Sequence, residues 1–173
     1  MSWRNFKIAT AVATILMLGG CGNIEVGTLD SRVNNQMSRI FVTETIGRAG
    51  QIYDRALQSA LYVQGKAAPT FELTSSISFT SSSNLSVRGI SSTFKKMVMV
   101  TSFELKKQGS NEILLRDTIT ADATLGTVSS LFSQDQSETH ARDRMAKLLA
   151  QRVVQRLQLF FLNKQSNESL QYK

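Results

Sequence analysis

The sequence predicts an α/β (α+β) fold, a two-layer sandwich with two helices packed on a four-stranded, mostly antiparallel sheet. Two stretches carry apolar residues at three- and four-residue steps, which is the period of an amphipathic helix. Three stretches between them alternate apolar and polar residues, which is typical of strands with one buried face. One-sided helices and a one-sided sheet bury their apolar faces most economically against each other, which gives the order β-α-β-β-β-α. The order of the strands within the sheet does not follow from the sequence.

The first strand and the first helix follow each other closely. Residues 38–44 are rich in β-branched and aromatic side chains, which favours a short strand. Thr45 is then a candidate helix cap, and an apolar stripe occupies residues 49–61. We expect Gly65 and Pro69, the only proline, to end this helix.

The three alternating stretches predict an antiparallel meander. They occupy residues 71–80, 97–105 and 113–123, and their apolar side chains hold odd positions, so each strand has one buried face. Serines break the alternation after the first of them, and residues 81–93 are therefore expected to form a loop or a long hairpin tip. Residues 107–111 read as a turn. Asp117 lies on the apolar side of the last strand, where it marks either a strand irregularity or a contact with a partner.

The last helix is expected to begin near Gln134–Glu138. Its apolar stripe runs from Ala141 to Phe161, with basic side chains on the flanks. The polar residues 163–173 are expected to fray. These elements predict a single sandwich domain over residues 38–162.

The N-terminal segment has the layout of an export signal. Basic residues precede a short apolar run in residues 1–20, and this run is shorter than the ~20 apolar residues that cross a bilayer. Leu18-Gly19-Gly20-Cys21 resembles a bacterial lipobox, in which the cysteine is acylated and becomes the first residue of the mature protein. The alternative is a simple secretory signal beside an incidental cysteine. Residues 21–37 then hold the acylated cysteine and a flexible tether.

Charge and cysteine content limit the possible partners. The chain has 20 Lys+Arg and 13 Asp+Glu, and residues 1–20 hold two of the basic residues, so the mature charge is 18 − 13 = +5. An exported basic protein is expected to meet anionic lipid or an acidic protein surface and not nucleic acid. The alternative is that the positive charge only keeps the domain soluble. A single cysteine excludes an internal disulfide, a zinc cluster of cysteines and a cysteine nucleophile paired with a base.

Nothing in the sequence argues for an enzyme, a metal or a cofactor. His140 is the only histidine, and a solvated helix residue is the expected reading of it. The serines between residues 75 and 92 lie in no Gly-x-Ser-x-Gly elbow. The Gly-x-x-Gly from Gly47 to Gly50 lacks the Lys-Ser/Thr continuation of a phosphate loop.

The order of these segments resembles a known family. A lipobox cysteine, a helix ending in Ala-Leu-Gln-Ser-Ala-Leu, a Phe-Glu-Leu strand and a long loop come first. A Val-Thr-Ser-Phe-Glu-Leu strand, a turn, a fourth strand and the helix from Ser137 to Leu157 follow. Over residues 18–162 this resembles the lipopolysaccharide-assembly lipoprotein family (LptE), most clearly at Ala141–Leu157. The chain departs from the family at residues 81–95, because the polar-aromatic stretch that the family has before its third strand is replaced here by Ser91-Ser92-Thr93-Phe94-Lys95-Lys96.

The resemblance implies a location and partners. Family members are small lipoproteins, lipid-anchored at the periplasmic face of the outer membrane. They plug an LptD-like β-barrel translocon subunit, assist its assembly and bind lipopolysaccharide. Gly22 after Cys21 agrees with the outer membrane, because an aspartate there often signals inner-membrane retention. The Ser/Thr faces at 74–80 and 118–122 would suit a polar barrel lumen.

Lipopolysaccharide carries phosphates, so basic side chains near loops are the candidate contacts. These candidates are Arg88, Lys95, Lys96, Lys106 and Lys107, and the alternative for each is an ordinary solvated side chain. A competing function is an accessory lipoprotein of an envelope phospholipid transport system, which needs a hollow between helices and sheet. A periplasmic hydrolase is disfavoured because the sequence lacks a nucleophile beside a base.

Overall fold

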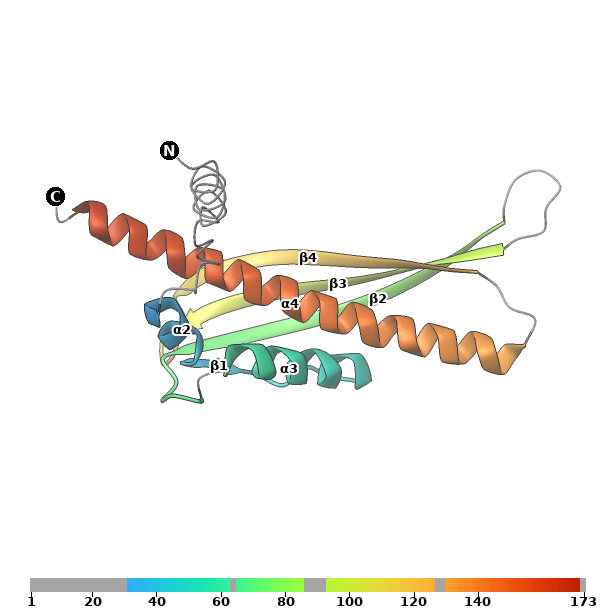
Figure 1. The fold of residues 1–173 in the computed structure, drawn as a ribbon, viewed down its shortest axis with the longest axis horizontal. Helices are drawn as coiled ribbons and strands as arrows, with labels where there is room; N and C mark the ends of the chain where they lie inside the picture. The colour runs from blue at the N-terminus through green and yellow to red at the C-terminus, as the bar shows by residue number, and fades with distance from the viewer. Residues whose placement is uncertain (1–30, 63–64, 86–92, 127–129, 172–173) are drawn as a thin grey trace, which may run out of the picture. The chain divides into compact units, whose positions relative to one another are not determined.

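The helices and strands follow one another in the order that the sequence predicts, and one additional helix precedes the first strand. The computed structural model describes residues 31–62, 65–85, 93–126 and 130–171. Its elements are α2 (Ser31–Met37), β1 (Ile40–Val42), α3 (Arg48–Leu61), β2 (Phe71–Leu85), β3 (Thr93–Lys107), β4 (Ile113–Gly126) and α4 (Leu131–Gln171) (Figure 1). The signal segment and Cys21 lie outside the described residues.

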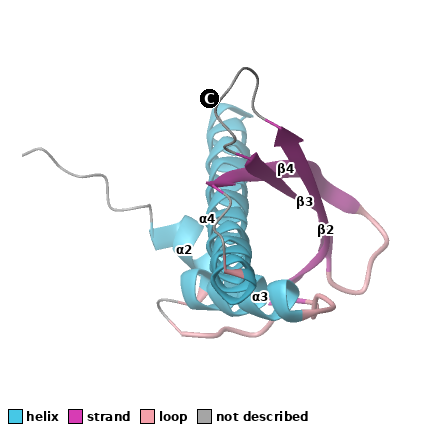
Figure 2. Cartoon of the chain, turned by 90° about the vertical axis from the view of Figure 1, so that its right-hand side faces the viewer, coloured by secondary structure: helices cyan, strands magenta, loops and turns pink. Residues whose placement is uncertain are grey.

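The two-layer sandwich is confirmed. The helices α3 and α4 lie on one side of a four-stranded sheet (Figure 2). The strand order is β1-β2-β3-β4, so strands that follow each other in the chain are neighbours in the sheet. The pairs β2–β3 and β3–β4 are antiparallel, whereas β1 runs parallel to β2 and pairs only with its first residues, from Ile40↔Phe71 to Val42↔Leu73.

The hairpin of β2 and β3 is longer than the sequence predicts. Serines 81–83 were expected in a loop, but β2 continues to Leu85, which pairs with Thr93. This expectation was wrong because a run of serines interrupts the side-chain alternation without interrupting the backbone pairing to β3. Only residues 86–92 of the expected loop remain, and they lie outside the described part of the chain.

The tether prediction was wrong for residues 31–37. They form α2, whose Val33 and Met37 lie one helical turn apart and are both buried. Two apolar residues are too few to show a helical period in the sequence. Packing against α4, which supplies Phe161 beside Val33, stabilises this short helix.

The helix α3 begins three residues after Thr45, so the expected cap was also wrong. Gly47, with φ of +90°, precedes the first turn and supplies no side-chain cap. The N–H and hydroxyl of Thr45 instead donate to the carboxylate of Asp54, at 2.7 and 2.8 Å. The stripe itself is confirmed at Tyr53 and Leu57, which are buried.

The helix α4 extends beyond both predicted ends. Leu131 and Phe132 were expected in a loop, and residues 163–171 were expected to fray, yet all of them are helical. Neither end contains glycine or proline, so no residue there forces the helix to stop. The stripe from Ala141 to Phe161 packs on the sheet as predicted.

Large side chains fill the space between the two layers. The fully buried ones come from the sheet and from both long helices: Tyr53, Leu57, Leu73, Met97, Met99, Phe103, Leu105, Leu149, Val153 and Leu157. The phenol of Tyr53 lies 3.1 Å from the hydroxyl of Ser75 and so joins α3 to β2. Thr101 is the polar exception on the inner face of β3, because its buried hydroxyl has no hydrogen-bond partner among the described residues.

Candidate functional site

The predicted basic residues lie at two ends of β3 and not in one cluster. Lys95 and Lys96 are near its start, and Lys106 and Lys107 are its last residues. Lys106 follows Lys95 by eleven residues along the strand, which corresponds to about 36 Å. Arg88 lies outside the described residues. The structure therefore does not bring the four described candidates together.

Lys95 serves an internal contact. Its side chain points to the helix layer, and its ammonium nitrogen donates to the carboxylate of Glu138 on α4 at 2.7 Å. Gln134 and Arg142 also donate to Glu138, at 3.1 and 3.5 Å. The hydrogen bond from Lys95, followed by that from Gln134, lowers the pKa of Glu138. This cluster fixes the first turns of α4 against the start of β3.

Lys96 points away from the helices and is exposed. Three exposed apolar side chains lie at the same end of the sandwich, Phe94 beside it on β3 and Leu131 and Phe132 at the start of α4. They are 46%, 89% and 74% exposed. Figure 1 shows the first turns of α4 and the start of β3 at one end of the sandwich. We call Phe94, Lys96, Leu131 and Phe132 the distal end. It presents a cation together with apolar surface.

The face of the sheet that points away from the helices is rich in hydroxyl groups. Its side chains occupy even positions, and the exposed ones include Thr74, Ser76, Ser78, Thr80, Ser82, Ser102, Thr118, Thr120 and Thr124. The hydroxyls of Ser102 and Thr118 lie 3.1 Å apart across two strands. We call this surface the open face. The outward orientation that the sequence predicts for the Ser/Thr positions is confirmed.

Charged side chains occupy the other end of the open face. Glu104 accepts from Lys106 at 3.1 Å and from Arg116 at 2.6 Å. The hydrogen bond from Lys106 is the largest cause that lowers the pKa of Glu104. Lys106 is thus engaged within the sheet, while Lys107 is exposed.

Asp117 has a partner inside the molecule. The guanidinium of Arg156 on α4 donates to its carboxylate at 2.5 Å, and Arg152 donates to the carbonyl of Thr120. The contact with Arg156, and then the N–H of Thr118, lower the pKa of Asp117. These arginines lie one turn apart beside the apolar stripe of α4. A charged strand residue on the buried side and basic residues on a helix flank are the sequence signals that could have revealed this contact.

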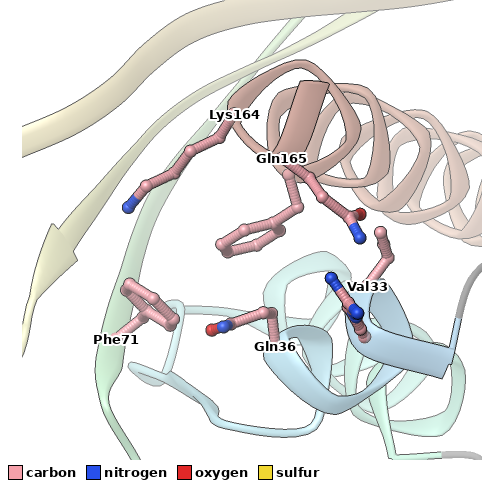
Figure 3. A pocket seen from close by; sticks show the side chains of 7 residues that line it. Val33, Gln36, Phe71, Lys164 and Gln165 are labelled. Atoms are coloured by element: carbon pink, nitrogen blue, oxygen red, sulfur yellow. The ribbon is translucent and has the colours of Figure 1, made fainter. Parts of the chain in front are cut away.

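A small pocket lies where α2, the start of β2 and the end of α4 meet (Figure 3). It has a volume of about 180 Å³. Val33, Phe71 and Phe161 give it an apolar floor, and the two rings lie 5.3 Å apart. Arg32 and Lys164 supply its basic side chains. Sequence reasoning missed this pocket because residues 31–37 were expected to form a tether and residues 163–173 to fray.

The described part of the chain contains no cluster of metal-binding side chains. Three or more His, Cys, Asp or Glu side chains that could hold a metal ion do not come together there. His140 is exposed on α4, as its sequence context predicts. None of the described helices combines the length and apolar character needed to span a membrane.

Comparison with known proteins identifies the kind of chain that has this architecture. Residues 33–157 match the model of the family described as LptE, lipopolysaccharide-assembly. No curated protein sequence gives a significant match.

Several solved structures share the fold at low sequence identity. A candidate lipoprotein of Caulobacter crescentus CB15 is 14% identical with a TM-score of 0.60, and the match covers 77% of this chain and 97% of that one. The rare lipoprotein B of Shewanella oneidensis is 13% identical with a TM-score of 0.56, covering 73% and 96%. A minor lipoprotein of Acinetobacter baumannii is 13% identical with a TM-score of 0.54, covering 70% and 92%. At such identities the likeness concerns the fold alone.

Proposed function

Since the chain belongs to the LptE lipopolysaccharide-assembly family, we propose that it is a lipoprotein partner of a β-barrel lipopolysaccharide translocon. In this proposal Cys21 carries the lipid anchor, and the chain lies at the periplasmic face of the outer membrane. The sandwich enters the lumen of an LptD-like barrel subunit, plugs it and assists its assembly. The protein acts as a binding subunit and not as an enzyme.

The observation that carries the proposal is the open face. A barrel lumen is lined by polar side chains and water. Hydroxyl groups both donate and accept hydrogen bonds. The rows of hydroxyl side chains that begin at Thr74 on β2 and at Thr118 on β4 can therefore bind to hydrogen-bond donors or acceptors of a polar wall. A sheet that faced a lipid surface or an apolar partner would be expected to carry apolar side chains at these positions.

The filled core favours this function over phospholipid carriage. A carrier needs an apolar hollow between its layers for acyl chains. In this protein Tyr53, Met97, Met99, Phe103 and Leu149 occupy that space and are fully buried.

We further propose that the distal end contacts lipopolysaccharide. Lys96 offers an exposed cation for a phosphate, and Phe94, Leu131 and Phe132 offer apolar contacts for acyl chains. Arg88, which precedes β3 in the sequence, is proposed to add a second cation. Lys95 contributes indirectly, because its contact with Glu138 keeps α4 and β3 together.

Affinity purification of the full-length chain from detergent-extracted membranes tests the translocon role. We expect a large outer-membrane β-barrel to be recovered in a one-to-one ratio. Recovery of the chain alone, or with inner-membrane transporter subunits, contradicts the proposal. A Cys21→Ser variant is expected to fold normally and to leave the membrane fraction when the barrel is absent. Membrane retention of that variant without the barrel would contradict the lipid anchor.

A further inference from the structure

One long edge of the sheet has no neighbouring strand among the residues that the structure describes. The three residues of β1 pair with the start of β2, and β3 pairs along the whole opposite side of β2. From Thr74 to Leu85, no other strand of the described residues pairs with β2 on the β1 side. We call this stretch the free edge. Thr43 donates to the carbonyl of Leu73, which shows that odd-numbered residues direct their backbone groups toward it.

The free edge therefore offers a complete set of strand-pairing groups. The N–H and C=O of Ser75, Ile77, Phe79 and Ser81 point outward, because backbone groups alternate between the two sides of a strand. The even-numbered residues between them pair with β3. Unpaired groups in such a row are a template for an additional strand.

The two edges of the sheet differ in their protection. Proteins usually guard an edge with charged side chains or proline. The edge strand β4 carries Arg116 and Asp122, and two arginines of α4 donate to its Asp117 and Thr120. The segment from Thr74 to Leu85 contains no charged residue, no proline and no glycine. The β4 edge is thus guarded by charged side chains, whereas the free edge carries no such guard.

A groove beside the free edge would hold the side chains of an added strand. It has a volume of about 320 Å³, and Phe79, Met99 and Ala49 form its apolar lining. Arg142 lies with its guanidinium carbon 4.6 Å from the centre of the Phe79 ring. Arg48 pairs with Asp143 and Arg142 with Glu138, each at 3.5 Å, so the cations at the groove already have anionic partners. The groove thus favours an uncharged apolar side chain.

We propose that the free edge receives an extended, uncharged segment of the barrel subunit, which adds to β2 as a further strand and places an apolar side chain over Phe79. This inference rests on the proposed translocon role. The strands of a barrel wall are already paired on both sides, so the segment comes from a loop or a terminus of that subunit. The free edge borders the open face, and both surfaces are free of net charge over residues 74–85, which suits a neutral strand.

Amide hydrogen exchange of the full chain, alone and in the purified complex with the barrel subunit, tests the proposal. In the free chain the odd-numbered amides of residues 75–81 exchange rapidly and the even-numbered ones slowly, because only the even-numbered N–H groups point toward β3. In the complex we expect exchange of the odd-numbered amides to slow by at least about tenfold. A complex that leaves them unprotected overturns the strand addition while the translocon role stands.

Protection of the odd amides already in the free chain would also overturn the proposal. Protection that depends on concentration would assign the edge to a second copy, and protection that does not would assign it to another segment of the same chain. If no complex with a barrel forms, the translocon role fails and this inference fails with it.

A proline variant gives an independent test. Ser81→Pro removes one N–H from the free edge and leaves the β3 pairing intact, because Pro is tolerated where its missing N–H faces outward. We expect at least about a tenfold loss of affinity for the barrel subunit with an unchanged circular dichroism spectrum. Ser59→Ala, at an exposed position of α3, is the control and should bind normally. Equal affinity of both variants contradicts the pairing.

Discussion

Among single residues, Thr101 occupies the least favourable position for its chemistry. Its hydroxyl is fully buried on the inner face of β3 and has no partner among the described residues. Burying an unpaired hydroxyl costs free energy, so Thr101→Val should raise the free energy of unfolding by about 1 kcal/mol. Urea denaturation checks this value. Thr101→Ala, which also removes a methyl group, is the control and should gain less. A Val variant less stable than the wild-type protein would show that the hydroxyl has a partner.

The pair of Lys95 and Glu138 should stabilise the fold in a pH-dependent way. The pKa of Glu138 is lowered in the folded state, so its contribution is present above the ordinary glutamate value of 4.5 and is lost as the pH falls through the folded-state value. A double-mutant cycle with Lys95→Met and Glu138→Gln should give a coupling of about 0.5–1 kcal/mol at pH 7. At pH 3 the coupling should shrink, and an unchanged value would exclude an ionic contact.

Substitutions of Lys96 and Lys107 show which basic end of β3 binds lipopolysaccharide. Lys96→Glu should weaken lipopolysaccharide binding about fivefold or more, since an exposed charge contact contributes about 1 kcal/mol. Lys107→Glu, an equal charge change at the opposite end, should leave binding unchanged. Binding is measured by fluorescence titration with lipopolysaccharide. The reverse ranking would move the site to the other end. A Lys95→Glu change is unsuitable, because it would face Glu138.

At the scale of elements, α2 is the one that the sequence pattern does not predict. If it belongs to the folded unit, Met37→Ala should lower the free energy of unfolding by about 2–3 kcal/mol, because Met37 is buried. Gln36→Ala, on the exposed side of the same helix, should change it little. Urea denaturation of both variants checks this. Equal stability of the two would mean that α2 is a detached tether.

Periodicity predicts the interior of each element better than its ends. The odd positions of β2, β3 and β4 and the stripe of α4 are correct because one buried face imposes a strict period. The end of β2 was predicted too early, at the serines 81–83, because backbone pairing continues without apolar side chains. Leu131, exposed at the start of α4, likewise gives no periodic signal.

The candidate site was only partly predictable for a related reason. The hydroxyl rows of the open face follow from the strand period. The contact of Lys95 with Glu138 and that of Asp117 with Arg156 join residues 43 and 39 positions apart. Such pairs depend on how α4 crosses the sheet, and a single sequence does not specify that crossing.

At the scale of the whole molecule, the core between the two layers is filled and the outer face of the sheet is rich in hydroxyl groups. Both features suit a domain that is surrounded by the polar wall of a barrel. The two layers give the sandwich one helical side and one open face. The family is one of lipopolysaccharide assembly, and the open face supports the proposed role of a partner enclosed by a translocon barrel.

Cysteine labelling in intact outer membranes tests this role most directly. A Ser78→Cys variant places a thiol on the open face, and its reaction with a water-soluble maleimide is compared between the membrane-bound chain and the purified free chain. Free Ser78→Cys protein should react readily, because the position is exposed. We expect the open face to be shielded by the barrel wall, so labelling in membranes should fall by at least about tenfold. Equal labelling in both states would contradict the enclosure of the sheet by a barrel.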